Sequence, residues 1–169
     1  MAAKTLIFFA AYLKTNLQSI MEYRANFLIQ TISMFLNDIV WMIFWFLFFS
    51  KFPVINNWFF SDMIVLYAVI TIAWGLQVII FGNFEEIADI IKEGKLDFYL
   101  ALPKEELLHV LISNTHFSAY GDFFFGIAML FFIDPVKYPL LLLLIVLSTV
   151  IIVAFVVIQI PITGKVQFR

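Results

Sequence analysis

The chain has 169 residues, of which 64% are hydrophobic and 13% are charged, and its mean hydropathy is +1.03. Apolar residues make up roughly half of a soluble domain, so this composition excludes a soluble globular protein and makes lipid the expected solvent. A formal net charge of −2 gives no basis for nucleic-acid binding. The sequence contains no cysteine, which excludes disulfides and thiolate metal sites.

The N-terminal segment KTLIFFAAYLKTNLQSIMEYR predicts an interfacial helix. Its apolar residues recur near helical spacing, while Lys4, Lys14 and Arg24 hold polar positions, as in helices that lie on a membrane surface. Lys14 interrupts the apolar run and no clear small-residue cleavage site follows, so the segment is not a typical cleavable signal. A frayed, polar-flanked approach to the first span is the alternative.

Four continuous apolar runs predict transmembrane helices, namely Phe27–Phe49, Met63–Phe81, Phe117–Ile133 and Pro139–Ile160. Each is close to the ~20 residues that a helix needs to cross a core of ~30 Å. Because the runs do not alternate, they exclude the strands of a membrane barrel. We expect the third run to extend back into one helix from Lys104 to Ile133. The sequence therefore predicts an all-α, polytopic membrane protein, with residues 1–169 forming a single transmembrane domain.

Lysine and arginine predict the orientation of these spans. With four spans, the N-terminal segment, the joint between the second and third spans, and the tail lie on one side of the membrane. That side holds all the Lys and Arg residues except Lys51 and Lys137. The positive-inside rule therefore predicts that both termini and this joint face the cytoplasm.

Charge is concentrated in that joint, FEEIADIIKEGKLDFYLALPKEE, which we name the charged joint (Phe84–Glu106). One face of the predicted helix is apolar and consists of Phe84, Ile87, Ile90 and Ile91. The other positions hold Glu85, Glu86, Asp89 and Glu93. Gly94 is placed to end the helix in a left-handed conformation, and Pro103 to open the next helix. From spacing alone, a solvated loop with a membrane-resting helix explains the pattern at least as well as a docking surface does.

Within the charged joint, EGKLDFYLALP resembles the cytoplasmic G-x-L-D-x-x-L-x-x-P signature of ABC-2-type permeases, the membrane subunits of a class of ATP-binding-cassette exporters. The matching positions are Gly94, Leu96, Asp97, Leu100 and Pro103. MEYRANF, Met21–Phe27, is similar to the segment that leads into the family's first span. The order of elements agrees as well.

This resemblance implies that the charged joint is a coupling helix seated in a cleft of a separate ATPase subunit, which would bind the ATP. The docking surface would consist of Glu85, Glu86, Asp89, Lys92 and Glu93. A second permease copy or homologue would complete the transporter in a bacterial or archaeal plasma membrane. Family members usually carry further spans that complete the pathway, so we expect the chain to be incomplete at its C-terminus.

The sequence does not predict a nucleotide site in this chain. A P-loop needs a first glycine five residues before its Gly-Lys pair, and Asp89 and Gln159 stand at those positions. We therefore expect no enzyme activity and no bound cofactor. A non-transporting scaffold or assembly subunit is the competing function, and a channel is disfavoured because no span shows a filter-like run.

Two acids are predicted inside the membrane, Asp38 near the middle of the first span and Asp122 in the third. A central charge costs roughly 2.5–3.5 kcal/mol on insertion scales. Each acid therefore either serves function in a bundle, a water-filled path or a partner contact, or is hydrogen-bonded for packing only. Gly121 and Gly126 would allow close helix approach. His109 and His116 are about 10.5 Å apart along a helix, too far to share one metal ion.

Overall fold

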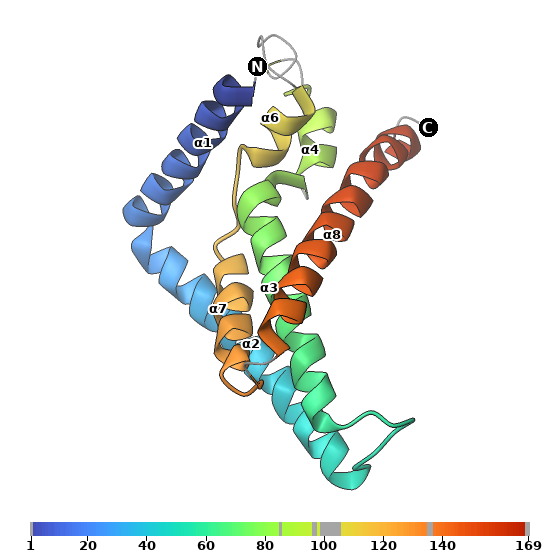
Figure 1. The fold of residues 1–169 in the computed structure, drawn as a ribbon. Coiled ribbons are helices and arrows are strands. Elements are labelled where there is room, and N and C mark those ends of the chain that lie inside the picture. Colours follow the sequence, from blue (N-terminus) through green and yellow to red (C-terminus); the bar gives the residue numbers. More distant parts are fainter. Residues whose placement is uncertain (1, 85, 96–97, 99–105, 135–136, 168–169) are drawn as a thin grey trace.

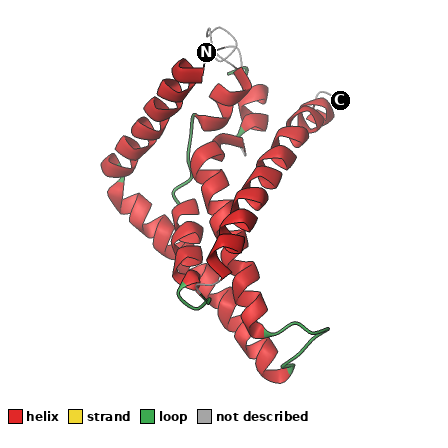
Figure 2. Cartoon of the chain, viewed as in Figure 1, coloured by secondary structure: helices red, strands yellow, loops and turns green. Residues whose placement is uncertain are grey.

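The computed structural model describes residues 2–84, 86–95, 98, 106–134 and 137–167, and within them the chain is helical with no strand (Figures 1 and 2). In chain order the elements are α1 (Ala2–Glu22), α2 (Arg24–Lys51), α3 (Phe60–Phe81), the 3₁₀ helix η1 (Gly82–Phe84), α4 (Ile87–Lys92), α6 (Glu106–Ile112), α7 (Ala119–Leu130) and α8 (Tyr138–Gln167). The prediction of an all-α fold is confirmed.

Three of these helices are long and apolar enough to cross a membrane: α2, α3 together with η1, and α8. They correspond to the first, second and fourth predicted spans, and the chain is a multi-pass membrane protein. The predicted N-terminal helix is present as α1. The chain bends between α1 and α2 (Figure 1), and Tyr23 is the residue between the two helices. The position of α1 at the membrane surface stays a prediction.

The prediction of one continuous third helix is wrong. Its expected start at Lys104 lies outside the described residues, and the described part is broken into α6 and the 12-residue α7, with residues 113–118 between them. Local side chains compete with the helical backbone there: the Asn114 side chain accepts the Thr115 N–H (2.8 Å), and the Ser113 hydroxyl donates to the Val110 carbonyl (2.8 Å). At 1.5 Å per residue, α7 is only about 18 Å long and does not cross the core alone.

The helices pack most closely where glycines face a neighbouring backbone. A Cβ atom at Gly121 would lie 2.5 Å from the Thr31 carbonyl oxygen of α2, and one at Gly126 would lie 2.5 Å from Ile72 Cγ1 of α3. The close approach predicted for these two glycines is therefore confirmed. Gly75 of α3 plays the same role from the other side, because a Cβ atom there would lie 2.9 Å from Phe123 Cβ of α7. As a result α7 is held between α2 and α3.

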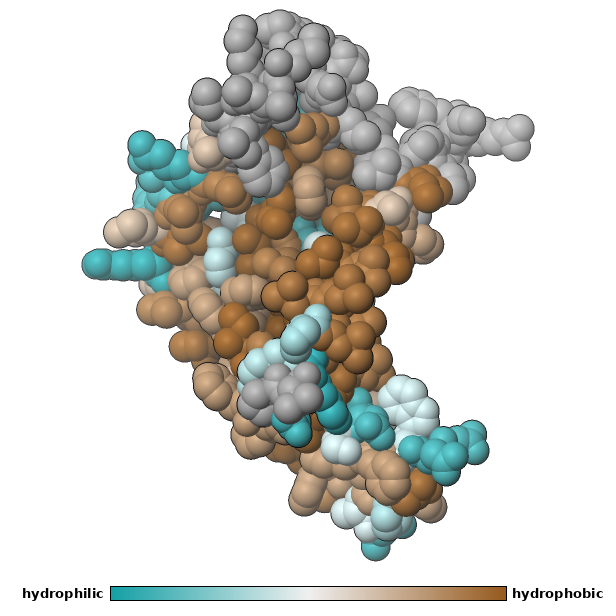
Figure 3. All heavy atoms as spheres, viewed as in Figure 1, coloured by the Kyte–Doolittle hydropathy of each residue, from teal (hydrophilic) through white to brown (hydrophobic). Residues whose placement is uncertain are grey.

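Apolar side chains cover most of the outer surface. Figure 3 shows a largely hydrophobic surface over the middle of the molecule, with hydrophilic residues at the lower end, at the upper left edge and in a small group on the front. Leu47 of α2 and Leu142 of α8 are among the exposed apolar side chains, at 58% and 68%. In a membrane such faces are covered by lipid or by another apolar helix.

Candidate functional site

The charged joint begins as a short helical element fastened to α6. Ile87 and Ile90 of α4 are buried against Val110 and Leu111 of α6, with Phe81 and Phe84 packed at the edge of this cluster. The predicted apolar face of the joint therefore exists, and it packs on another helix of the same chain. This packing leaves the opposite, charged side of α4 outward.

The outward side of α4 carries exposed charges that pair with one another. Asp89 and Lys92 form an ion pair of 3.0 Å one turn apart, and Glu93 pairs with Lys95. All four residues are exposed. Exposed pairs of this kind are worth about 0–1 kcal/mol, so they open at little cost when a partner offers its own charges.

Gly94 ends α4 in the way the sequence predicts. Its φ of +69° lies in the left-handed region that favours glycine, and the N–H of Lys95 donates to the carbonyl of Ile90 (3.0 Å). The remaining predicted coupling residues lie outside the described residues: Glu85, Leu96, Asp97, Leu100 and Pro103. Their role stays a prediction.

Hydrogen bonds tie the start of the charged joint to the break in the third span. Asn83, 2% exposed, donates through Nδ2 to the Val110 carbonyl (2.8 Å) and to the Ser113 hydroxyl (2.7 Å). Asn114 donates to Glu86 (3.3 Å). Gly82 lies against the same segment, where a Cβ would be 2.9 Å from Thr115 Cα. Glu86 was predicted as a docking charge, but here it also holds the segment after α6.

Asn83 is a functional candidate that the sequence analysis did not single out. It belongs to no charged run and no motif, and its partners are a backbone carbonyl and a hydroxyl about thirty residues later. The sequence feature that could have identified Asn83 is its position, because an amide side chain that is buried at the end of an apolar span must find a hydrogen-bond partner.

A second contact joins the N-terminal helix to α6. The Tyr12 hydroxyl hydrogen-bonds to Nε2 of His109, and their rings meet edge to face with centroids 5.3 Å apart. His109 is buried, so this contact lies inside the helix assembly. Within the described part of the chain, no group of three or more His, Cys, Asp or Glu side chains is placed to hold a metal ion.

The two membrane acids lie together where three helices meet. Asp38 of α2 and Asp122 of α7 are 3% and 5% exposed, and their carboxyl groups are close neighbours. From α3, the Tyr67 hydroxyl donates to Asp38 Oδ1 (3.4 Å). Phe125, 1% exposed, packs edge to face on Tyr67 at 5.8 Å and on Phe35 at 5.5 Å. The sequence placed both acids in the membrane but did not pair them.

A polar stripe runs along the outer face of α2. It consists of Asn26, Gln30, Ser33 and Asn37, spaced four, three and four residues apart so that they share one helix face. Three of them are exposed and Gln30 is half-buried, with its amide donating to Asn26 (3.0 Å). We refer to these four residues as the α2 stripe.

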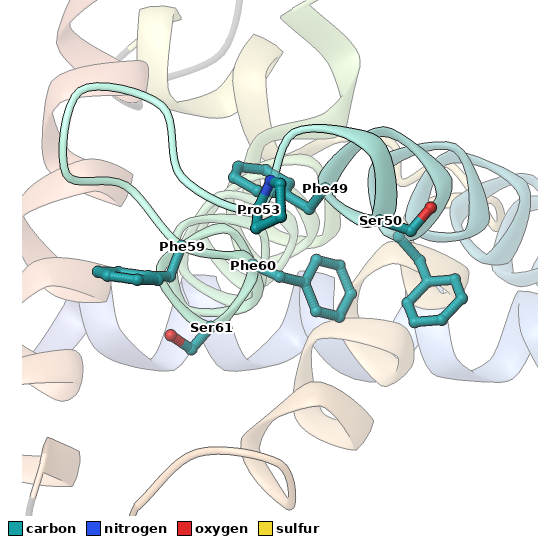
Figure 4. Close-up of a pocket in the computed structure, with 7 residues that line it drawn as sticks. Phe49, Ser50, Pro53, Phe59, Phe60 and Ser61 are labelled. Carbon is teal, nitrogen blue, oxygen red and sulfur yellow. The ribbon is translucent and has the colours of Figure 1, made fainter.

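The C-terminal end of α2 and the N-terminal end of α3 line an open apolar pocket of about 330 Å³. Its lining is aromatic apart from Pro53 and two serines, with Phe49, Phe59 and Phe60 arranged around it (Figure 4). The two helices are joined here by a tight turn in which Asn56 and Asn57 have positive φ values. The lining contains no charged residue, so the pocket offers apolar contact without reactive chemistry.

A family model described as ABC-2 family transporter protein matches residues 35–168. The chain belongs to this family. No curated protein and no solved structure shows significant similarity to it. As an ABC-2 family member the chain is a membrane permease component of an ABC transporter, which confirms the family inferred from the charged joint. The match covers the whole of that joint, whereas Met21–Phe27 precedes it.

Proposed function

We propose that this ABC-2 permease couples ATP hydrolysis by a separate cassette ATPase subunit to the export of a substrate, and that the charged joint receives the ATPase. The observation that carries the proposal is the two-sided character of α4. Its apolar side is locked on α6, while Asp89, Lys92 and Glu93 stay exposed. A rigidly mounted, charged helix suits a docking role because charges across an interface set register and partner choice.

The attachments of the joint give a physical route from docking to the spans. A displacement of α4 would be carried to α6 by the shared apolar cluster. It would reach the segment after α6 through Asn83 and through the bond between Glu86 and Asn114. That segment leads directly into α7, which is packed between α2 and α3. Closure of an ATPase pair would in this way shift α7 relative to its neighbours. The permease needs no catalytic residue or bound cofactor of its own for this role.

The α2 stripe supports a second permease copy as partner. Asn and Gln each carry a donor and an acceptor, so two copies of the same stripe can hydrogen-bond to each other. Polar side chains that face away from their own bundle gain most from such contacts in lipid.

Both termini and the charged joint are proposed to face the cytoplasm. Cysteines placed at Lys92 and Asn57 should then react with an impermeant reagent from opposite sides.

The test reverses two exposed acids of the joint and leaves intact the hydrogen bonds of Asn83 and Glu86 that tie the joint to the third span. In the complete transporter, the double variant Asp89→Lys and Glu93→Lys should insert normally but capture about tenfold less ATPase subunit, a change of about 1.4 kcal/mol. Permease-stimulated ATP turnover should fall with it, and the loss should vary with salt. The matched control is Lys51→Glu with Lys137→Glu, two reversals remote from the joint. Equal ATPase capture by both double variants would favour the scaffold function instead.

A further inference from the structure

The Asp38–Asp122 pair lacks the groups that normally stabilise buried carboxylates. Asp38 is 3% exposed and Asp122 5%, so water does not solvate either charge well. The titratable groups next to Asp38 are Tyr67 from α3 and Asp122 from α7, and those next to Asp122 are Asp38 and Tyr67. Neither of these partners is a cation, so within the residues that the structure describes no salt bridge neutralises the two acids.

Hydrogen-bond donors are too few for two ionised carboxylates. An ionised carboxylate carries acceptors only, and among the described residues the pair receives one hydroxyl proton, that of Tyr67, on Asp38 Oδ1. Asp38 Oδ2 is buried and receives no hydrogen bond within the described part of the chain. Two neighbouring carboxyl groups attract each other only when a proton lies between them, because two like charges side by side cannot both persist in a water-poor site.

We propose that Asp38 and Asp122 form a proton-binding site, in which one proton held between the two buried carboxyl groups joins α2 to α7. The site lies on the same helix pair as the close crossing of Gly121 over Thr31. While the proton is bound, the carboxyl groups attract and the crossing stays closed. When it leaves, two like charges repel across the same interface. The α2–α7 contact therefore depends on protonation, independently of whether the charged joint binds an ATPase.

The site is tested by replacing the shared proton with a permanent donor. Asp122→Asn keeps the shape of the side chain and supplies an amide N–H to Asp38, and Asp38→Asn does the same from α2. If the shared proton holds α2 to α7, the stability of the parent should be greatest at low pH, where the proton is bound, and should fall as pH rises and the proton leaves. In both Asn variants that fall should be absent. Asp62→Asn, at the start of α3, is the matched control and should keep the fall.

The measurement is the thermal unfolding midpoint of the full chain in lipid nanodiscs across a pH series, with an infrared spectrum of each sample. The parent should show the carbonyl stretch of a protonated carboxylic acid inaccessible to solvent exchange, and Asp38→Asn or Asp122→Asn should lack it. A parent without that band overturns the proposal even if a variant does not fold. Stabilisation of the parent by added sodium at fixed pH, with no dependence on pH, would identify a metal-cation site instead.

Discussion

Helices α3 and α8 are both apolar enough to cross a membrane, yet they occupy opposite environments. Of the most apolar 18-residue stretch of each, 44% is buried in α3 and 6% in α8. The difference follows from the few residues that are not large and apolar. α3 has Gly75 against α7, and the 3₁₀ turn after α3 contains Asn83, whose amide bonds to Val110 in α6 and to Ser113 directly after α6. Apolarity selects lipid over water, but small and polar residues select the interior of the bundle.

α8 offers little of this kind. Between Tyr138 and Phe155 the polar side chains of α8 are three hydroxyl groups, those of Tyr138, Ser148 and Thr149. Thr149 donates to the Ile145 carbonyl of its own helix (2.8 Å), so it makes no bond to a neighbour there. The contacts of α8 with the bundle centre on Leu141, which packs with Ala68 and Val69 of α3. The helix thus packs on α3 near its start and also contacts α4, and its side chains are exposed along much of the described length.

The largest expected effect comes from truncating a buried side chain of α3. Ile72→Ala should lower the free energy of unfolding by about 2–5 kcal/mol, because Ile72 is 4% exposed and fills the crossing with α7. The matched change in α8, Leu147→Ala, removes a side chain that is 48% exposed. It should stay within about 0.5 kcal/mol, since lipid covers that face in both states. Denaturation in mixed micelles measures both. Equal losses would mean that α8 is buried as deeply as α3.

A smaller effect is expected from the polar contacts of the two spans. Asn83→Ala leaves the Ser113 hydroxyl and the Val110 carbonyl without their shared donor, which should cost about 1–3 kcal/mol. Proteolysis between α6 and α7 should become faster. Thr149→Ala removes a bond within one helix and should change neither stability nor cleavage measurably. If the two variants behaved alike, the bond from Asn83 would not hold the third span.

The smallest effect concerns the anchor at the start of α8. The Tyr138 hydroxyl donates to the Leu130 carbonyl at the end of α7 (3.1 Å), and Tyr138 is 40% exposed. Tyr138→Phe should therefore cost about 0.5–1.5 kcal/mol at most, the net value of one hydrogen bond. Hydrogen exchange should rise at the α7–α8 turn and not in α3. Faster exchange throughout α3 would show that the anchor of α8 also stabilises the central helix.

The sequence by itself determined the solvent, the class and the family of this protein. Length and composition required a helical membrane protein, because backbone groups in lipid must be paired within helices or closed barrels. The glycine stop at Gly94 and the two-faced pattern of Ile87 and Ile90 are local properties, so they were readable from spacing. The signature from Gly94 to Pro103 pointed to the ABC-2 family, to which the chain belongs.

Tertiary structure alone decided which helices lie inside and which distant residues meet. Composition predicted an unbroken third span, yet it breaks at Ser113–Ser118, because side chains there bond to the local backbone and Asn83 reaches them from another span. The pairing of Asp38 with Asp122 depends on how α7 fits between α2 and α3, a consequence of Gly121 and Gly126 meeting the backbones of those helices. Such contacts join residues far apart in the chain, and hydropathy along a single helix carries no information about them.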